Sequence, residues 1–329
     1  MDYDDEVYGS MRIEEPVLLD LLASATLTRL KGVLQHGVSG LIGVTKPVTR
    51  FEHSVGAMLL VRRLGGSLEE QIAALLHDAS HTAFSHVIDY VFDGHDSQSY
   101  HDERKEEFLA QTDTPDILAW HGYDWRDFLH EENFPLLEQP SPRLCADRLD
   151  YFLRDARGLG LATAVHIQTA LDHLARVGGR IAATSLTAAQ WLGYTFIAAD
   201  DASWANFREV GLYELTAQAI RRGLHIGAIS EADIWGTDVP FWAKLHAHPD
   251  AGLQATLRLV HPDTSFAWDE ANPTFCVSTK LRASDPDVWL DNGRLVPLSV
   301  LDPDFARHRA TYLHSKQGKW PMRVIPPAT

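Results

Sequence analysis

Three histidines and two aspartates lie within thirteen residues of one run, directly after an apolar segment. They are His77, Asp78, His81, His86 and Asp89. So many titratable groups are unusual in a buried segment, because removing polar and charged groups from water is costly. A metal ion compensates for that cost, since imidazoles and carboxylates lose little when a cation replaces their water. The run therefore predicts a metal site.

A helix is needed to position this run. Ser67 and Glu70 fit a capping box at its start, and apolar residues recur at helical spacing from 68 to 76. We expect this core helix to reach about Asp78. His77 and Asp78 would then lie at its buried C-terminal end.

Two further candidate ligands lie on other expected helices. His53 falls near the start of a core helix that ends at about residue 65. By itself, a histidine there is more often a hydrogen-bonded core residue than a metal ligand. Asp147 falls on the apolar side of an expected helix at 144–155. The flanks of that helix carry Arg148, Arg154 and Asp155.

Composition limits the class of protein. The chain has 329 residues, of which 45% are hydrophobic, enough for one large domain or two smaller ones. Its formal charge of −16 argues against a nucleic-acid partner, because it repels polyanions at long range. A small anion would need a local positive site, which a metal and a few arginines can provide.

The sequence also gives expectations about location. It has no run of 18 or more apolar residues and its first residues are acidic, so we expect a cytoplasmic protein without a membrane partner. Cys145 and Cys276 lack CxxC spacing, which indicates neither a disulfide framework nor a thiolate zinc site.

The pattern along the chain favours a mainly α fold. We expect a helical domain over residues 1–225 and a C-terminal α+β lobe over residues 226–329, packed on it. Short surface helices are expected at 112–142. Strand-like runs at 275–281 and 294–298, separated by turn residues, predict a small antiparallel sheet.

Three motifs carry a family resemblance. Residues 49–54 read TRFEHS, residues 77–86 read HDASHTAFSH, and residues 147–155 read DRLDYFLRD. In this order they resemble the HD superfamily of metal-dependent phosphohydrolases, most specifically the branch of deoxynucleoside triphosphate triphosphohydrolases. The likeness spans roughly residues 5 to 160 and implies an HD-domain helical bundle.

The resemblance implies one metal ion held by His53, His77, Asp78 and Asp147. Such mixed imidazole and carboxylate ligands suit a divalent transition metal, namely Mn, Fe, Co, Ni or Zn, with Mg possible. The ion would polarise a phosphoryl group and help to supply a nucleophile.

The resemblance also implies roles for other histidines. His81 and His86 would be the acid/base and phosphate-contacting histidines, with Asp89 orienting His86, and His101 a further family histidine. Histidine suits proton exchange near neutrality because its ordinary pKa is about 6.5.

By the same resemblance, several side chains would bind substrate. Arg50 and Arg148 would contact phosphate, whereas Tyr151 and Asp155 would face the sugar. Gln35 corresponds to the sugar-reading glutamine of the family. His36 stands where an aliphatic residue is expected, which leaves the preference for deoxyribose open. These residues together predict a small phosphorylated substrate, a nucleotide or deoxynucleotide being favoured.

Alternatives remain at this point. His81, His86 or His101 could take a second metal, as in the dinuclear HD-type oxygenases, or the substrate could be a phosphate ester other than a nucleotide. A binding module and a homo-oligomer are also left open. The region 206–215 offers Arg208 and Tyr213 but lacks the Arg, His and Tyr cluster that grips a triphosphate in the branch. We therefore expect hydrolysis that does not require an intact triphosphate.

Overall fold

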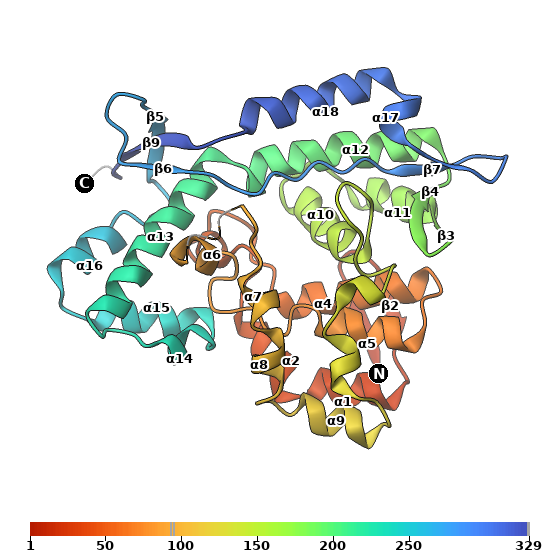
Figure 1. The fold of residues 1–329 in the computed structure, drawn as a ribbon, viewed down its shortest axis with the longest axis horizontal. Coiled ribbons are helices and arrows are strands. Elements are labelled where there is room, and N and C mark those ends of the chain that lie inside the picture. Colours follow the sequence, from red (N-terminus) through yellow and green to blue (C-terminus); the bar gives the residue numbers. More distant parts are fainter. Residues whose placement is uncertain (93, 95, 328–329) are drawn as a thin grey trace.

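A computed structural model describes residues 1–92, 94 and 96–327. The fold is mainly helical with small strand pairings, as predicted (Figure 1). The N-terminal region forms β1 (Asp2–Asp5), β2 (Gly9–Arg12), α1 (Pro16–Ala23), α2 (Ala25–Arg29), the 3-10 turn η1 (Leu30–Gly32) and α3 (Gly37–Leu41). The first two strands pair as an antiparallel hairpin, which the sequence did not reveal.

Helices α4 (Arg50–Arg63) and α5 (Leu68–Leu76) form the centre of the fold. Thr49 caps α4 through a capping box with Glu52, and Ser67 caps α5 in the same way with Glu70. These reciprocal bonds satisfy backbone N–H groups that a helix start leaves unpaired. The predicted capping box is therefore confirmed. Helix α5 ends at Leu76, slightly earlier than expected, and His77 is its C-cap.

A series of short elements follows the histidine-rich run. They are α6 (Val87–Val91), α7 (Tyr100–Glu103), α8 (Lys105–Leu109), α9 (Thr114–Trp120), η2 (Trp125–Phe128) and η3 (Glu131–Asn133). The short helices expected at 112–142 are present, and they lie at the surface with one side packed on the core. Phe128 is 2% exposed, and Leu136 and Leu137 are fully buried in the main core.

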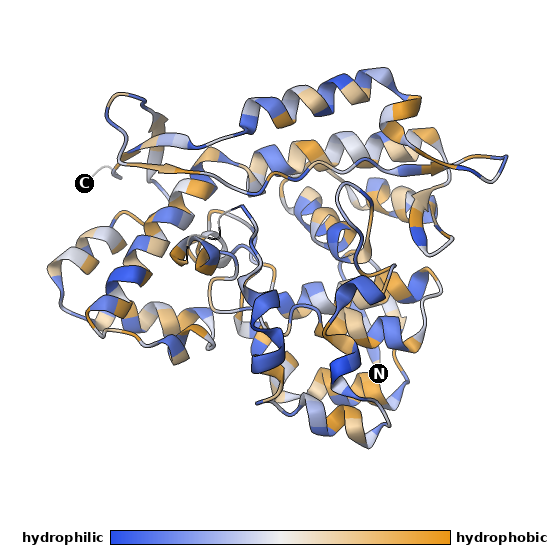
Figure 2. Cartoon of the chain, viewed as in Figure 1, coloured by the Kyte–Doolittle hydropathy of each residue, from blue (hydrophilic) through white to orange (hydrophobic). Residues whose placement is uncertain are grey.

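The helices of the second half lie above this region and, for α13 to α16, to its left (Figure 1). They are α10 (Ala146–Gly158), α11 (Ala164–Asp172), α12 (Leu186–Ala199), α13 (Phe207–His225), α14 (Glu231–Ile234), α15 (Asp238–Ala247), α16 (Ala251–Leu257), α17 (Leu298–Leu301) and α18 (Pro303–Lys316). A π-helical turn, η4 (Asp200–Trp204), links α12 to α13. Most of these helices carry both hydrophobic and hydrophilic residues, consistent with one buried face (Figure 2).

Strands beyond the hairpin form two further sheets. They are β3 (Leu174–Val177), β4 (Arg180–Ala183), β5 (Ser265–Trp268), β6 (Phe275–Val277), β7 (Asp287–Trp289), β8 (Leu295–Pro297) and β9 (Trp320–Ile325). One sheet has the order β3-β4-β7-β8 and the other β5-β9-β6. The expectation that the runs at 275–281 and 294–298 share one antiparallel sheet was wrong, because β6 pairs with β9 whereas β8 pairs with β7.

The C-terminal region packs closely on the helical part. Strand β7 pairs with β4 in parallel, and α18 lies along α12. Phe305 of α18 is fully buried in the same core cluster as α4 and α5. These contacts do not test the domain boundary expected at residue 225, which remains a prediction. Within the described part of the chain, no helix is long and apolar enough to cross a membrane.

Candidate metal centre and its cavity

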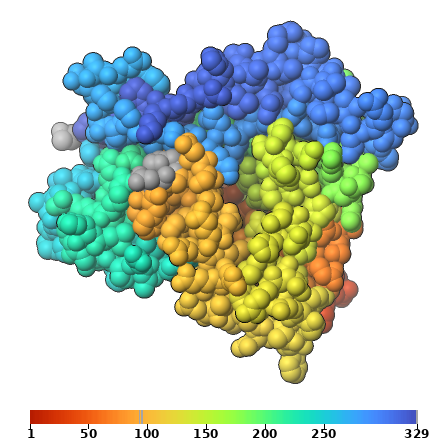
Figure 3. All heavy atoms as spheres, in the orientation of Figure 1, coloured from red at the N-terminus to blue at the C-terminus, as the bar shows by residue number. Residues whose placement is uncertain are grey.

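A cavity of about 690 Å³ collects most of the predicted site residues. Its walls come from the start of α4, the run after α5, α7, α8, α10, the α12–α13 connection and residues 280–284 of the C-terminal region. Figure 3 shows the molecular surface hollowed between orange, yellow-green and blue segments, which correspond to these parts of the chain. A cavity of this size suits a small-molecule ligand.

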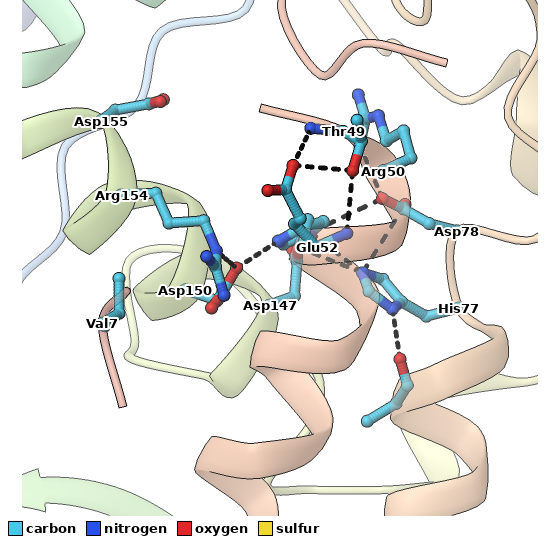
Figure 4. Close-up of polar contacts among 12 residues, drawn as sticks. Val7, Thr49, Arg50, Glu52, His77, Asp78, Asp147, Asp150, Arg154 and Asp155 are labelled. Carbon is cyan, nitrogen blue, oxygen red and sulfur yellow. Dashed lines mark hydrogen bonds and ion pairs between the residues drawn. The ribbon is translucent and has the colours of Figure 1, made fainter. Parts of the chain in front are cut away.

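His53, His77 and Asp147 bring their ligand atoms together at one point. The Nε2 atoms of His53 and His77 are 3.1 Å apart. Oδ1 of Asp147 lies 3.0 Å from Nε2 of His53 and 3.5 Å from Nε2 of His77. Helices α4 and α10 and the end of α5 supply one residue each. Figure 4 shows His77 and Asp147 on their separate elements.

The tautomers of the two histidines follow from their outer contacts. Nδ1 of His77 lies 2.7 Å from the Ala74 carbonyl, so it must donate, and Nδ1 of His53 lies 2.7 Å from Oδ2 of Asp150. Each neutral ring then has a lone pair on Nε2. Two lone pairs and a carboxylate oxygen thus face one another, an arrangement that requires a cation or an added proton between them. The donor set fits a divalent metal ion.

Asp78 links this group to the neighbouring histidines. Its Oδ2 lies 3.6 Å from Nε2 of His53 and accepts a hydrogen bond from Nη1 of Arg50 at 2.8 Å. Its Oδ1 lies 3.6 Å from Nε2 of His77 and 3.2 Å from Nε2 of His81. Asp78 therefore lies beside the point where the other three predicted ligands meet (Figure 4).

Electrostatics of the cluster agree with this arrangement. Burial alone would lower the pKa of His77, but the Asp78 and Asp147 carboxylates outweigh it and raise that pKa to about 10. Burial would raise the pKa of Asp147, yet its contacts with His53 and His77 hold it well below the usual value. The cluster thus favours a positive charge at its centre.

A second group of histidines lies on the other side of Asp78. The rings of His81 and His101 stack with centroids 3.7 Å apart, and His86 meets His81 edge-on with centroids 5.0 Å apart. Burial lowers the pKa of all three well below 6.5, with Arg50 adding to the effect at His81 and His86. All three are therefore neutral at pH 7.

His86 has the orienting contact that the sequence predicted. Its Nδ1 lies 3.0 Å from Oδ2 of Asp89, which is itself buried, and Oδ1 of Asp89 accepts the Tyr100 amide at 3.0 Å. His101 lines the cavity with a side chain that is 12% exposed, so it is not a surface residue at a helix end.

Among the predicted sugar-binding residues, Asp155 already has hydrogen-bond partners on both oxygens. Oδ1 of Asp155 is 2.8 Å from Nε2 of His36, and Oδ2 accepts the indole N–H of Trp204 at 2.7 Å. Trp204 also meets the Tyr151 ring edge-on with centroids 4.8 Å apart. Within the described part of the chain, the buried Oε1 of Gln35 lacks a hydrogen-bond partner, which leaves it available to a ligand in the cavity.

The two arginines predicted to contact phosphate differ in their contacts. Arg50 is buried and holds Asp78 and Ser85. Nη1 of Arg148 donates to the Arg143 carbonyl at 2.5 Å, and its Nη2 lies 3.3 Å from Glu138. Both line the cavity, but both already have a carboxylate partner.

Known proteins resemble the chain over this same region and beyond it. The HD domain family matches residues 50–155, which contain all four predicted metal ligands. The metal-dependent phosphohydrolase cns2 of Cordyceps militaris is 38% identical over 320 residues, which cover 95% of this chain and 92% of cns2. The chain belongs to the HD-domain metal-dependent phosphohydrolases.

Further comparisons extend this result. The deoxynucleoside triphosphate triphosphohydrolase SAMHD1 of Danio rerio is 30% identical over 105 residues, 27% of this chain and 17% of SAMHD1. The crystal structure of a phosphohydrolase from Bacteroides thetaiotaomicron superposes with a TM-score of 0.67 at 17% identity and covers 100% of both chains. The chain thus shares the fold of that phosphohydrolase over its whole length.

Behind the candidate metal ligands lies a buried charge network that the sequence did not predict. Arg154, expected on a helix flank, is 2% exposed and bonds to Asp150 at 2.8 Å and to Asp5 at 2.7 Å. A Cβ atom on Gly56 would lie 2.0 Å from Oδ1 of Asp150, so glycine is required for this close approach. The spacing of Asp150, one helical turn after Asp147, was the available signal.

Proposed function

We propose that the chain hydrolyses a phosphate ester or anhydride of a small molecule, most specifically a nucleotide, with one divalent metal held by His53, His77, Asp78 and Asp147. The observation that carries this proposal is the convergence of the Nε2 lone pairs and carboxylate oxygens beside a set of neutral histidines. When bound, the metal supplies Lewis-acid polarisation of a phosphoryl group and lowers the pKa of water.

The chain's own residues perform the proton transfers in this proposal. Neutral His81 and His86 can each accept a proton from the attacking water or pass one to the leaving oxygen. Hydrolysis breaks the bond between phosphorus and that oxygen, and water supplies the new P–O bond. Asp89 fixes the ring of His86, because their contact holds the Nδ1 proton and leaves Nε2 for exchange.

Three observations support a nucleotide as the substrate class. Tyr151 and Trp204 place aromatic surface in the cavity, which suits a base or sugar. The unpaired Oε1 of Gln35 can accept a hydroxyl or amino hydrogen. SAMHD1, which matches part of the HD domain, is named for deoxynucleoside triphosphates. The engagement of Asp155 by His36 and Trp204 leaves the choice between ribose and deoxyribose open.

A panel assay tests the proposal. Protein loaded separately with Mn, Fe, Co, Ni, Zn or Mg is incubated with nucleotides and with other phosphate esters, and the products are identified by mass spectrometry. We expect release of phosphate or of a phosphate chain from at least one nucleotide. If only phosphate esters other than nucleotides are cleaved, the proposed hydrolase activity stands but the nucleotide substrate class is overturned.

A dinuclear centre is the second candidate. It is favoured by Asp78, His81 and His101, whose ligand atoms all lie within 4.8 Å of one another. A second metal there would share Asp78 with the first and would open the oxygenase alternative. Metal content near two per chain supports this candidate, and content near one supports the hydrolase with a single metal. The cytoplasmic location, the absence of a nucleic-acid or membrane partner, and the homo-oligomer remain predictions.

A further inference from the structure

The C-terminal region brings two cations into the cavity that the family motifs do not include. Lys280 and Arg282 line the cavity wall, on the stretch between β6 and β7. Residues 280–285 are called the cationic segment below. The sequence did not predict that this segment lines the site, because it lies far along the chain from the motifs at 49–155.

The other cations lining the cavity are neutralised by carboxylates. Arg50 pairs with Asp78 at 2.8 Å, Lys105 with Glu131 at 2.6 Å, and Arg148 with Glu138 at 3.3 Å. Each of these cations therefore has its charge compensated inside the protein. A further anion in the cavity would gain less from them than from cations without such partners.

Lys280 and Arg282 differ from these three. Nζ of Lys280 donates to the Ser97 carbonyl at 3.1 Å, and Arg282 donates to Oε1 of Gln98 and to the Lys280 carbonyl. Among residues 1–92, 94 and 96–327, neither the Lys280 ammonium nor the Arg282 guanidinium forms an ion pair with a carboxylate within 4.0 Å. In a protein of formal charge −16, two adjacent cations without carboxylate partners in a cavity mark a place for an anion.

The backbone of the cationic segment is held in place. The Arg282 amide donates to Oδ2 of Asp200 at 2.9 Å, and the Ala283 carbonyl accepts Nε of Arg309 at 3.0 Å. The Asp285 amide donates to the Pro142 carbonyl at 2.8 Å. These anchors fix the segment across the cavity wall, so little ordering is needed when an anion binds.

Two arginines near the end of α13 point elsewhere. Arg221 binds the Tyr90 carbonyl and Glu214, and Arg222 binds Asp250 at the surface.

We propose that Lys280 and Arg282 bind a second phosphate of the substrate, beyond the phosphate that is cleaved at the metal. This inference rests on the proposed function and narrows its substrate class to small molecules with at least two phosphates. A second phosphate can be joined to the first, as in a nucleoside diphosphate, or attached elsewhere on the sugar. The cationic segment thereby gives the C-terminal region a part in substrate selection.

Binding of non-hydrolysable probes tests this inference directly. Calorimetry compares methylenebisphosphonate with methylphosphonate on the metal-loaded full chain, because their P–C bonds resist hydrolysis. For Lys280→Ala and for Arg282→Ala we expect bisphosphonate affinity to fall about tenfold or more and methylphosphonate affinity to change less than about threefold. Arg282→Lys should keep part of the affinity, because it keeps the charge.

The matched control is Arg258→Ala, an exposed arginine outside the cavity lining. It should leave both affinities unchanged. Equal losses for the two probes in the Lys280 and Arg282 variants, or no loss, would overturn the inference. Kinetics then separate the two kinds of second phosphate: the same variants should raise KM for a nucleoside diphosphate, for a 3′,5′-bisphosphate, or for both, more than for the monophosphate.

Failure of this inference can be distinguished from failure of the proposed function. If the protein hydrolyses a nucleotide but the variants bind both probes as tightly as the unchanged protein, the second-phosphate site is disproved and the proposed hydrolase activity stands. If bisphosphonate affinity depends on Lys280 and Arg282 but no phosphate ester is hydrolysed, the proposed hydrolase activity is disproved and the anion site stands.

Discussion

Nδ1 of His53 lies 2.7 Å from Oδ2 of Asp150, and both side chains are fully buried. Burial would raise the pKa of Asp150, but Arg154 and His53 outweigh it and lower that pKa, so the carboxylate stays charged. The charged oxygen holds the proton of His53 on Nδ1. The Nε2 lone pair is thereby directed toward His77 and Asp147, where the metal is proposed to bind.

Replacing Asp150 should therefore weaken metal binding without touching a proposed ligand. In Asp150→Asn the amide keeps the shape but no longer favours one tautomer of His53. We expect metal affinity to fall about 10- to 100-fold in competition titrations with a chelator. Asp116→Asn, at an exposed aspartate of α9, is the control. An unchanged affinity in Asp150→Asn would show that His53 needs no orienting carboxylate.

His86 provides a test of the proton-transfer role. His86→Ala should keep the full metal content and lose about 10² to 10⁴ in turnover, as expected for a missing general acid or base. The comparison is His314→Ala, at an exposed histidine of α18. Loss of metal together with activity would make His86 a ligand and strengthen the dinuclear candidate.

A substitution at Gly56 tests the close packing behind the candidate metal ligands. A Cβ atom there would lie 2.0 Å from Oδ1 of Asp150 and 2.1 Å from Nη2 of Arg154. We expect Gly56→Ala to lower the free energy of unfolding by about 1–3 kcal/mol, measured by denaturant titration. Gly158→Ala is the matched helical control, since its nearest neighbour would be Cβ of Lys46 at 3.5 Å. A Gly56→Ala protein as stable as that control would contradict the packing described here.

Asp200 gives a pH dependence with a defined sign. Its burial raises its pKa from 3.8 to about 6. Between these values the folded state holds a proton that the unfolded state has released, so the free energy of unfolding falls as pH rises from about 4 to about 6. The full effect is roughly 3 kcal/mol, from two pKa units at 1.36 kcal/mol each.

The variant Asp200→Asn isolates this contribution. The amide oxygen can still accept the bonds from Tyr312 and from the Arg282 backbone, but it does not titrate. The pH dependence of unfolding should therefore be shallower in the variant than in the unchanged protein over this window. If the free energy of unfolding has the same pH dependence in both proteins, Asp200 does not keep its proton in the folded state.

Local sequence patterns were enough to predict the two central helices. A capping box and apolar periodicity located α5, and an apolar pattern that ends at glycines located α4, because these signals act within one or two turns. The order of His53, His77, Asp78 and Asp147 pointed to one centre, and the structure places their side chains close together. Their roles as ligands remain a proposal.

Features that depend on distant contacts could not be predicted in this way. The sheets near the C-terminus were paired wrongly because short strands do not reveal their partners, and β9 lies about 45 residues beyond β6. Arg154 was placed on a flank because its partner Asp5 lies at the other end of the region. Lys280 and Arg282 were missed for the same reason, since only the folded chain brings them to the cavity.

The central claim is that one metal, held by His53, His77, Asp78 and Asp147, is needed for hydrolysis. The most direct measurement is metal content per chain together with phosphate release, in the same samples of the unchanged protein and of the double variant His77→Ala/Asp78→Ala. We expect about one metal per chain and hydrolysis in the first, and neither in the second. Full metal content in the double variant, or hydrolysis that survives complete removal of metal, would contradict the claim.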